Sequence, residues 1–348
     1  MRLTKTLFIA FASLAFVANL AAQDLHNTLF YMNPLHINPA FSGAYEGTYR
    51  IGGVYRDQAR SVVSNAYSTP SFYIDAPILL IGKRHWIGVG GLMFQDVAGD
   101  GKLTTSSFQL TGSFHLALDK KSNTVLALGV QWGKVQRKLK NLRGLEAGDY
   151  LQQVLDEVSN AATDDELLNS SGSGGGGGSG QSDPKKDFTD INAGLLLSSI
   201  VNKTTNYNIG FSVRHITQPN YNFKSSNAKL PIRLTAHAQL NTALTDKISI
   251  TPELYYTSID PASQFQVHSW VGYMLKPEKN LKLSFGLGYR SNDAGQLLFG
   301  LDYGDLKAQI GYDLTLSSLN KANNYKGGFE IGVYYIGKIY KKPKVDPD

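Results

Sequence analysis

The clearest pattern along the chain is an alternation of apolar and polar residues with a period of two. In LKLSFGLGYR, residues 281–290, the odd positions are apolar or aromatic, and the even positions are lysine, serine, glycine or arginine. The stretches QLLFGLDYG, LKAQIGYDLTL and GFEIGVYYIGKI, which follow, alternate in the same way. A period of two is typical of a β-strand whose two faces meet different surroundings.

The same alternation, less regular, extends upstream and predicts fourteen strands. Most span roughly 10 to 13 residues, whereas strands of soluble proteins average five or six and a tilted strand needs about 9–11 residues to cross a bilayer. We expect the strands at residues 48–58, 69–78, 85–95, 104–118, 124–135, 188–199, 206–216, 229–240, 248–259, 265–275, 281–291, 294–304, 306–317 and 326–340.

The connections between these strands alternate in length. Short turns follow the even-numbered strands, for example DKKSN and KPEKN, and generally longer connections follow strands one, three, five, seven and thirteen. Short turns on one side and long loops on the other are typical of an outer-membrane barrel. An even strand number then predicts that both chain termini lie on the short-turn, periplasmic side. Because hydrocarbon tolerates no unpaired backbone groups, such a sheet must close on itself.

A soluble, lipocalin-like barrel also alternates, but with its apolar residues inside. Three features favour the membrane: the length of the strands, an export signal at the N-terminus, and the many glycines and charges on the polar face. We therefore predict an all-β fold, a transmembrane antiparallel barrel of about 14 strands in the cell outer membrane.

The first 22 residues predict a secretory signal peptide. Arg2 and Lys5 precede an apolar run from Leu7 to Val17, and small residues lead to Gln23. The alternative, a single membrane anchor, is disfavoured because this run is well short of the roughly 20 residues of a spanning helix.

The composition narrows the possible functions. Charged residues are only 18% of the chain, glycine and tyrosine are abundant, and there is no cysteine, which excludes disulfides and thiolate chemistry. The net charge is +6, or +4 once Arg2 and Lys5 are removed, with no long basic run. Nucleic acid is therefore not an expected partner.

The segment YMNPLHINPAFSGAYEG, residues 31–47, is apolar but contains two Asn-Pro pairs. Proline lacks an N–H and restricts the residue before it, so this segment suits neither a long helix nor a central strand. It is also too apolar for an ordinary linker.

The fifth connection, residues 136–187, is exceptionally long. It begins basic, turns acidic, and ends in a Gly/Ser tract that resembles an engineered linker but equally suits a natural flexible loop. Apolar residues at helical spacing within it (Leu151, Val154, Leu155 and Val158) indicate a short amphipathic helix. Long outer loops often bind partners, and the alternative is an insertion with no specific role.

The polar face of the strands is expected to line the lumen. Its charges could form salt bridges across the barrel or line a channel for an extended polypeptide. They are Arg214, Arg233, Lys282, Arg290, Lys307, Glu253, Asp302, Asp313 and Glu330.

Catalytic and cofactor motifs are absent from the sequence. The seven histidines form no HxH or HxxxH pair, and neither a phosphate-binding loop nor a GxSxG elbow occurs. We expect no enzyme activity, no metal and no cofactor.

Residues 31–47 resemble the opening of the PorP/SprF family of outer-membrane proteins of the type IX secretion system, although the junction at Met32 and Asn33 is one residue tighter. The resemblance resumes at YRDQAR, at YRSNDAGQLLFGLDYGDLKAQIGYDLTLSSL and at GGFEIGVYY. Departures from the family are Ala59 where tryptophan is frequent, Phe329-Glu330 where many members have His-Glu, the 136–187 insertion and the KKPKVDPD tail.

The resemblance implies a role in type IX secretion or gliding motility. It implies contacts with a cargo protein that bears a C-terminal sorting domain, and with a periplasmic peptidoglycan-binding lipoprotein or secretion ring components. Residues 23–47 would then form a plug at or in the periplasmic mouth. Candidate partner-binding residues are Asn33, Pro34, Asn38, Pro39, Phe41, Arg214, Arg233, Arg290, Asp302, Asp313 and Glu330.

Two other functions stay open from the sequence, a porin-like transporter of small solutes and, less favoured, an outer-membrane hydrolase. The expected organisation is a signal peptide (1–22), an N-terminal segment (23–47), the barrel (48–340) and a periplasmic tail (341–348).

Overall fold

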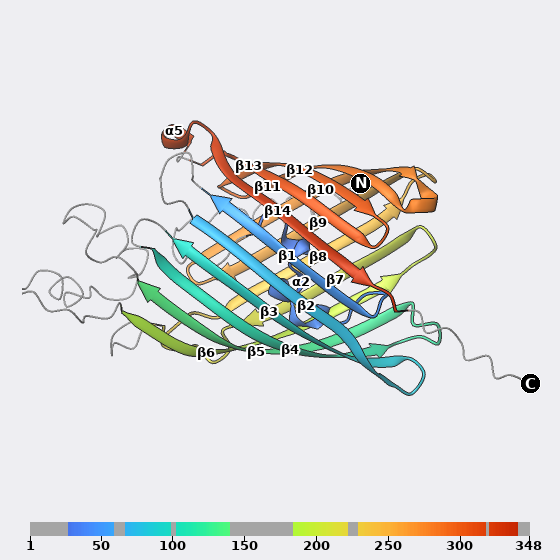
Figure 1. The fold of residues 1–348 in the computed structure, drawn as a ribbon, viewed down its shortest axis with the longest axis horizontal. Coiled ribbons are helices and arrows are strands. Elements are labelled where there is room, and N and C mark those ends of the chain that lie inside the picture. Colours follow the sequence, from blue (N-terminus) through green and yellow to red (C-terminus); the bar gives the residue numbers. More distant parts are fainter. Residues whose placement is uncertain are drawn as a thin grey trace, which may run out of the picture.

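The computed structural model describes residues 27–58, 67–98, 102–139, 184–221, 229–317 and 320–339. They form a closed antiparallel barrel (Figure 1) in which each strand pairs with its neighbours in sequence and the first pairs with the last. The strands are β1 (Tyr49–Gln58), β2 (Tyr67–Ile81), β3 (His85–Ala98), β4 (Leu103–Ala117), β5 (Thr124–Leu139), β6 (Lys185–Ile200), β7 (Thr205–Arg214), β8 (Arg233–Ala243), β9 (Ile248–Ile259), β10 (Ala262–Lys276), β11 (Leu281–Arg290), β12 (Ala294–Tyr303), β13 (Leu306–Thr315) and β14 (Lys326–Gly337). The predicted fold and the fourteen strands are confirmed.

The two faces of the wall have the predicted chemistry. On β5, Leu128, Val130 and Trp132 point outward and are 42–58% exposed, whereas Gln131 between them is 1% exposed and faces the lumen. Large apolar side chains stand exposed along the outside of most other strands, and buried arginines, acids, histidines and glutamines line the inside. The apolar exterior therefore suits lipid and the polar interior is enclosed, as expected of an outer-membrane barrel.

The two ends of the barrel differ in their connections. Residues 82–84, 118–123, 201–204, 244–247, 277–280 and 304–305 are short connections at one end, the turn side. β1 begins and β14 ends on this side, because Tyr49 pairs with Gly337. The opposite end, the loop side, has the longer connections, but not uniformly: β9 and β10 are joined by residues 260–261 alone.

Several strand boundaries differ from the expected ones. β8 begins at Arg233 and not at residue 229, because Pro231 has no N–H to contribute to a ladder. β5 and β6 extend to Leu139 and Lys185, which shortens the predicted fifth connection at both ends. β2 continues to Ile81, three residues past its predicted end. The signal peptide, residues 140–183 of the fifth connection and the tail lie outside the described residues.

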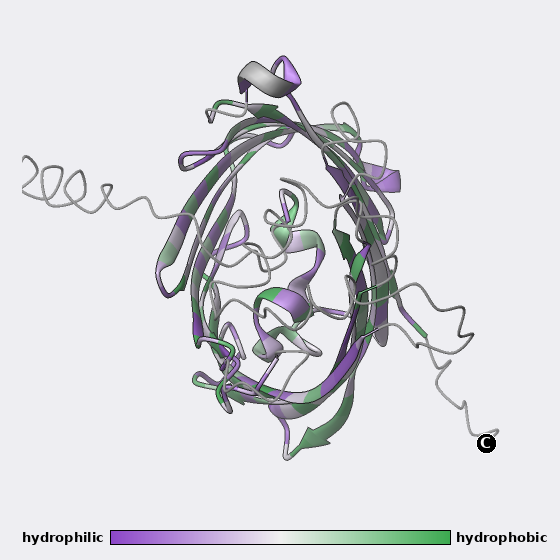
Figure 2. Cartoon of the chain, turned by 90° about the vertical axis from the view of Figure 1, so that its left-hand side faces the viewer, coloured by the Kyte–Doolittle hydropathy of each residue, from purple (hydrophilic) through white to green (hydrophobic). Residues whose placement is uncertain are grey.

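The helices among the described residues are all short. Three of them, η2 (Phe30–Met32), α2 (Pro34–Ile37) and η3 (Pro39–Phe41), lie inside the ring of strands when the barrel is viewed end-on (Figure 2). The other two, η5 (Pro277–Lys279) and α5 (Asn320–Asn323), are in a turn-side and a loop-side connection. Across the described ranges, no helix has the length and apolar character needed to cross a membrane.

Candidate functional site

Residues 27–44, which we call the lumen plug, cross the interior of the barrel. The two Asn-Pro pairs set their path. Pro34 and Pro39 occupy the first positions of α2 and η3, where a missing N–H and a fixed φ are tolerated. The side chain of Asn38 accepts a hydrogen bond from the N–H of Ala40 at 2.9 Å and so caps η3. The plug is thus a series of single helical turns and not one continuous helix.

Apolar side chains of the plug pack against the inner wall, as expected. Leu35 contacts the cluster that includes Tyr73 and Leu92, while Phe30 packs against Tyr255 with ring centroids 5.0 Å apart. A third cluster, on the other side of the lumen, joins Leu29 and Met32 to Val54, Trp270 and Leu298.

A charged cluster holds the start of the plug in the loop-side part of the barrel. The carboxylate of Glu330 accepts hydrogen bonds from the backbone N–H groups of Thr28 and Leu29 at 2.7 and 2.8 Å. Arg56 donates to the hydroxyl of Thr28 and forms ion pairs with Glu330 and Asp313, each at 2.9 Å.

Arg290 completes this cluster by pairing with Asp313. Arg290 also pairs with the partly exposed Asp293 at 2.6 Å. Two buried arginines therefore face two buried acids, so that none of these four buried charges is left unpaired.

A second ion pair holds the end of the plug near the turn side. Asp75 pairs with Arg50 at 2.9 Å and also accepts the N–H of Gly43 at 2.7 Å. Arg50 donates to the carbonyl of Phe41. The carbonyl of Ser42 accepts the hydroxyl of Ser113 at 2.6 Å.

Asn38 fixes the middle of the plug. Its amide nitrogen donates to the backbone carbonyls of Leu195 at 2.8 Å and Phe211 at 3.3 Å, and lies 3.1 Å from Nε2 of His237. Two wall glycines allow this approach: a Cβ on Gly194 would lie 2.0 Å from the Asn38 side-chain oxygen, and a Cβ on Gly129 would lie 2.3 Å from the nitrogen of Ala40.

The plug contacts the wall all the way round. Besides the strands already named, Gln266 of β10 donates to the Thr28 carbonyl, Gln131 of β5 to that of Leu35, and Ser212 of β7 to that of Ile37. Arg214 donates to the carbonyl of His36 at 3.1 Å. Polar contacts to the backbone dominate this set, so the wall recognises the main chain of the plug as well as particular side chains.

Burial keeps the phenols of Tyr31, in the plug, and Tyr45, directly after it, neutral. Enclosure in the lumen, with the charge of Glu253 as a smaller cause, raises the pKa of Tyr31 well above its ordinary value. Burial and then Asp75 likewise raise the pKa of Tyr45, whose hydroxyl donates to the Asp75 carbonyl.

The structure brings most of the predicted site residues together in the lumen. The plug contributes Asn33, Pro34, Asn38, Pro39 and Phe41, all buried, while Arg214, Arg290, Asp313 and Glu330 contact it from the wall. Arg233 bonds to Tyr255 and Thr257 and lies behind the plug. Asp302 is apart, paired with Lys282 at 2.8 Å.

The sequence analysis did not select Arg50, Arg56, Asp75 or His115, which also hold the plug. A signal existed for Arg56, which lies in the YRDQAR stretch at an inward position of β1. Ten of the eleven candidates are buried, five within the plug and five on the wall, so a partner could reach them only if the plug moved.

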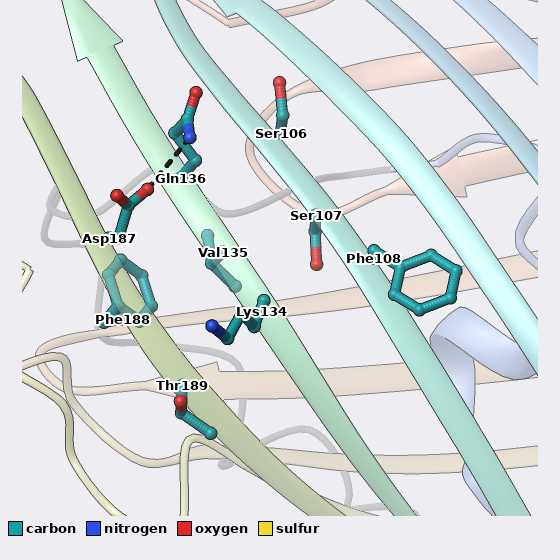
Figure 3. Close-up of a pocket in the computed structure, with 9 residues that line it drawn as sticks. All are labelled: Ser106, Ser107, Phe108, Lys134, Val135, Gln136, Asp187, Phe188 and Thr189. Atoms are coloured by element: carbon teal, nitrogen blue, oxygen red, sulfur yellow. Dashed lines mark hydrogen bonds between the residues drawn. The ribbon is translucent and has the colours of Figure 1, made fainter.

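A shallow hollow of about 560 Å³ lies across β4, β5 and β6 at the loop side (Figure 3). Its polar side chains include Lys134, Gln136 and Asp187, and the amide of Gln136 donates to Asp187 at 2.9 Å. Lys134 and Gln136 point outward with the lipid-facing side chains, whereas Ser107 and Val135 of the same lining are buried at inward positions. No group of three potential metal ligands occurs within the described ranges.

Comparisons with known proteins agree with the fold. The family model described as "Type IX secretion system membrane protein PorP/SprF" matches residues 19–335. No curated protein matches the chain.

Among solved structures, the P. putida toluene transporter TodX is similar over 88% of this chain and 93% of its own, with 11% identity and a TM-score of 0.50. The Ralstonia pickettii toluene transporter TbuX covers 94% of this chain and 97% of its own, with 11% identity and a TM-score of 0.47. The KdgM porin covers 82% and 98%, with 9% identity and a TM-score of 0.38. At such identities the likeness to TodX concerns the fold alone.

Proposed function

Because this chain belongs to the PorP/SprF family of type IX secretion system membrane proteins, we propose that it assists the export or surface attachment of a cargo protein bearing a C-terminal sorting domain. In this role it also contacts periplasmic components of the machine, either a peptidoglycan-binding lipoprotein or the ring proteins. The turn side of the barrel faces the periplasm, as short turns do in bacterial outer-membrane barrels. We propose that this role is non-enzymatic and that it also supports gliding motility.

The observation that carries this proposal, beside the family, is the lumen plug. Hydrogen bonds, ion pairs and packing tie residues 28–43 to strands on every side of the barrel. A barrel filled in this way is suited to recognising polypeptides at its ends and surfaces. It is poorly suited to the alternative function, the free passage of small solutes.

The plug also gives the buried candidates a role. Glu330 already binds two consecutive backbone N–H groups, and Arg214 a backbone carbonyl, so both recognise main chain. In the proposed cycle, an extended cargo segment takes the place of part of the plug and uses these same groups. Without cargo, the plug keeps the buried charges paired.

Affinity capture tests the proposal. The tagged full-length protein, isolated in mild detergent from cells of its source, should co-purify with a sorting-domain cargo or with a periplasmic machine component. Recovery of other porin-like proteins alone would contradict the proposal. A tagged unrelated outer-membrane barrel from the same cells serves as the control.

Planar-bilayer recording separates the secretion role from the porin alternative. With the plug seated, the purified protein should show no stable conductance of the size of an open porin. A steady, porin-sized conductance from the unmodified protein would favour solute transport and would overturn the plugged lumen.

A further inference from the structure

The hairpin of β2 and β3 extends past its neighbour β1 on the turn side (Figure 1). The pairing of β1 with β2 ends at Arg50 with Asp75. β2 continues to Ile81, and its pairing with β3 continues to Ile81 with His85, with a bulge between Pro77 and Leu79. We call residues 76–81 of β2 the overhang.

One backbone edge of the overhang has no partner strand among the described residues. The chain before β1 turns inward to become the lumen plug, so no described segment pairs with this edge of the overhang. Exposed strand edges of this kind are templates for pairing with another chain.

The side chains of the overhang are apolar and exposed. Ile78, Leu79, Leu80 and Ile81 are 59, 54, 63 and 39% exposed, although the last two are consecutive residues that point to opposite faces of the hairpin. Strands that are exposed to water commonly protect their edges with charges, proline or a bulge. Here Pro77 and the bulge protect the first part of the overhang, but none of the four positions from Ile78 to Ile81 is charged.

The surroundings of the overhang must provide hydrogen bonds to its backbone edge and must also cover its apolar side chains. Lipid would accept the side chains but not an unpaired backbone edge, because hydrocarbon offers no hydrogen bonds. Water would accept the backbone but not the four apolar side chains. An added β-strand from another polypeptide satisfies both at once.

A hollow beside the overhang provides space for a side chain of that strand. It has a volume of about 450 Å³ and is lined by Tyr45, Pro77, Leu80 and Trp86, with Ile78 and Leu79. Its floor is fixed, since Trp86 donates to the carbonyl of Gly43 at 2.9 Å and stacks on His115 at 4.6 Å. A large apolar or aromatic side chain suits this lining.

We propose that the overhang binds an extended, apolar segment of a partner protein, which adds as a strand beside residues 76–81 and places a large side chain against Tyr45 and Trp86. The overhang would then be the surface through which the barrel contacts the secretion machinery. The location of the partner in the periplasm rests on the proposed function; the strand addition itself does not. The hollow is bounded by Tyr45, directly after the plug, and by Trp86, which bonds to Gly43 of the plug, so a bound partner lies close to the plug's turn-side anchor.

Photo-crosslinking in cells of the source tests the inference. A photoreactive side chain is placed at Ile78, Leu79 or Leu80 of the full-length protein, and the adducts are mapped by mass spectrometry. A partner strand predicts one polypeptide, whose crosslinked residues shift by one along its sequence as the probe moves by one, as a β-ladder requires. Adducts with lipid alone, with this chain's own residues, or scattered over many proteins would overturn the inference.

Leu244 is the matched control position, since it is 60% exposed and also on the turn side, in the connection between β8 and β9. A probe there should give no ordered ladder. In addition, Leu80→Lys should reduce the adduct at Ile78 by about tenfold or more, because a charge on an edge strand blocks pairing. Leu244→Lys should leave that adduct unchanged, and an equal yield in both variants would contradict strand addition.

These outcomes are distinct from those of the function test. If affinity capture still recovers the cargo but the crosslinks show no ordered ladder, the docking surface is refuted and the proposed function is not. An ordered ladder to a protein outside the secretion machinery would uphold the surface and refute the proposed function.

Discussion

At the residue scale, Asn38 shows how one side chain can fix a segment inside a wide barrel. Its carbonyl oxygen caps η3, and its amide nitrogen reaches the carbonyls of two adjacent strands, β6 and β7. Aspartate has the same size but no N–H to donate. Placed here, it would bring a carboxylate oxygen against two carbonyl oxygens in a buried site.

We expect Asn38→Asp to loosen the plug and to lower stability by about 1–3 kcal/mol, the typical cost of leaving buried polar groups unsatisfied. The loss should appear as a lower heat-unfolding midpoint, measured by the gel mobility of the folded barrel in detergent. Asn206→Asp, at an exposed position that accepts a bond from Asn241, is the control and should change the midpoint little. Equal midpoints for both variants would show that Asn38 does not hold the plug.

The sequence indicated Asn38 but not its partners. Leu195, Phe211 and His237 lie 157 to 199 residues further along the chain. Periodicity reports which face of a strand a residue occupies and says nothing about which distant segment it meets. The same limit applies to Arg50 and Asp75, whose inward positions were readable but whose ion pair with each other, and contact with the plug, depend on closure of the barrel.

At the scale of the elements, β5 and the plug fit together only because one wall position has no side chain. A Cβ on Gly129 would lie 2.3 Å from the nitrogen of Ala40 and 2.6 Å from its Cα, and both are backbone atoms that cannot rotate away. Gly112 on β4 lies in a strand as well, but a Cβ there meets nothing within 4 Å.

We therefore expect Gly129→Ala to displace the plug while the barrel stays closed. Limited chymotrypsin digestion should then cut at Phe30, Tyr31 or Phe41 at least about tenfold faster than in the unmodified protein, because cleavage follows the population of the open form. Gly112→Ala should be cut at the unmodified rate. Slow cleavage in both variants would mean that the wall accommodates the extra methyl group.

The strands themselves were largely predictable, because each buries one face and exposes the other in a different medium. The alternation of apolar and polar residues failed to predict strand ends at which the two faces do not differ in this way. Residues 79–81 at the end of β2 were assigned to a turn, because they are apolar on both faces and do not alternate. The start of β8 was placed too early, since the alternation extends across Pro231 whereas the hydrogen-bonded ladder does not.

At the scale of the whole molecule, the outer face of the wall determines the medium that the protein occupies. Val130 lies near the middle of β5 and points outward, 58% exposed. In the membrane this position faces hydrocarbon. A charged side chain there would have to lose its hydration or extend to the membrane–water interface.

We expect Val130→Arg to reduce the folding free energy in lipid vesicles by about 2–4 kcal/mol, the cost of arginine near the bilayer midplane. The measurement is a denaturant titration of folding into vesicles. Val130→Leu, which keeps the site apolar, should differ little from the unmodified protein. A neutral effect of arginine would place this position outside the hydrocarbon layer.

The position of Thr28 has a consequence for the order in which the protein is assembled. One of its two acidic partners, Glu330, is 302 residues away, on the last strand to be synthesised. That strand also forms the seam with β1, the strand that directly follows the plug. The first described part of the chain therefore cannot complete its contacts until the final hairpin arrives. Docking of the plug and sealing of the cylinder are consequently one late event, and a barrel that lacks its C-terminal strands should be left both unsealed and empty.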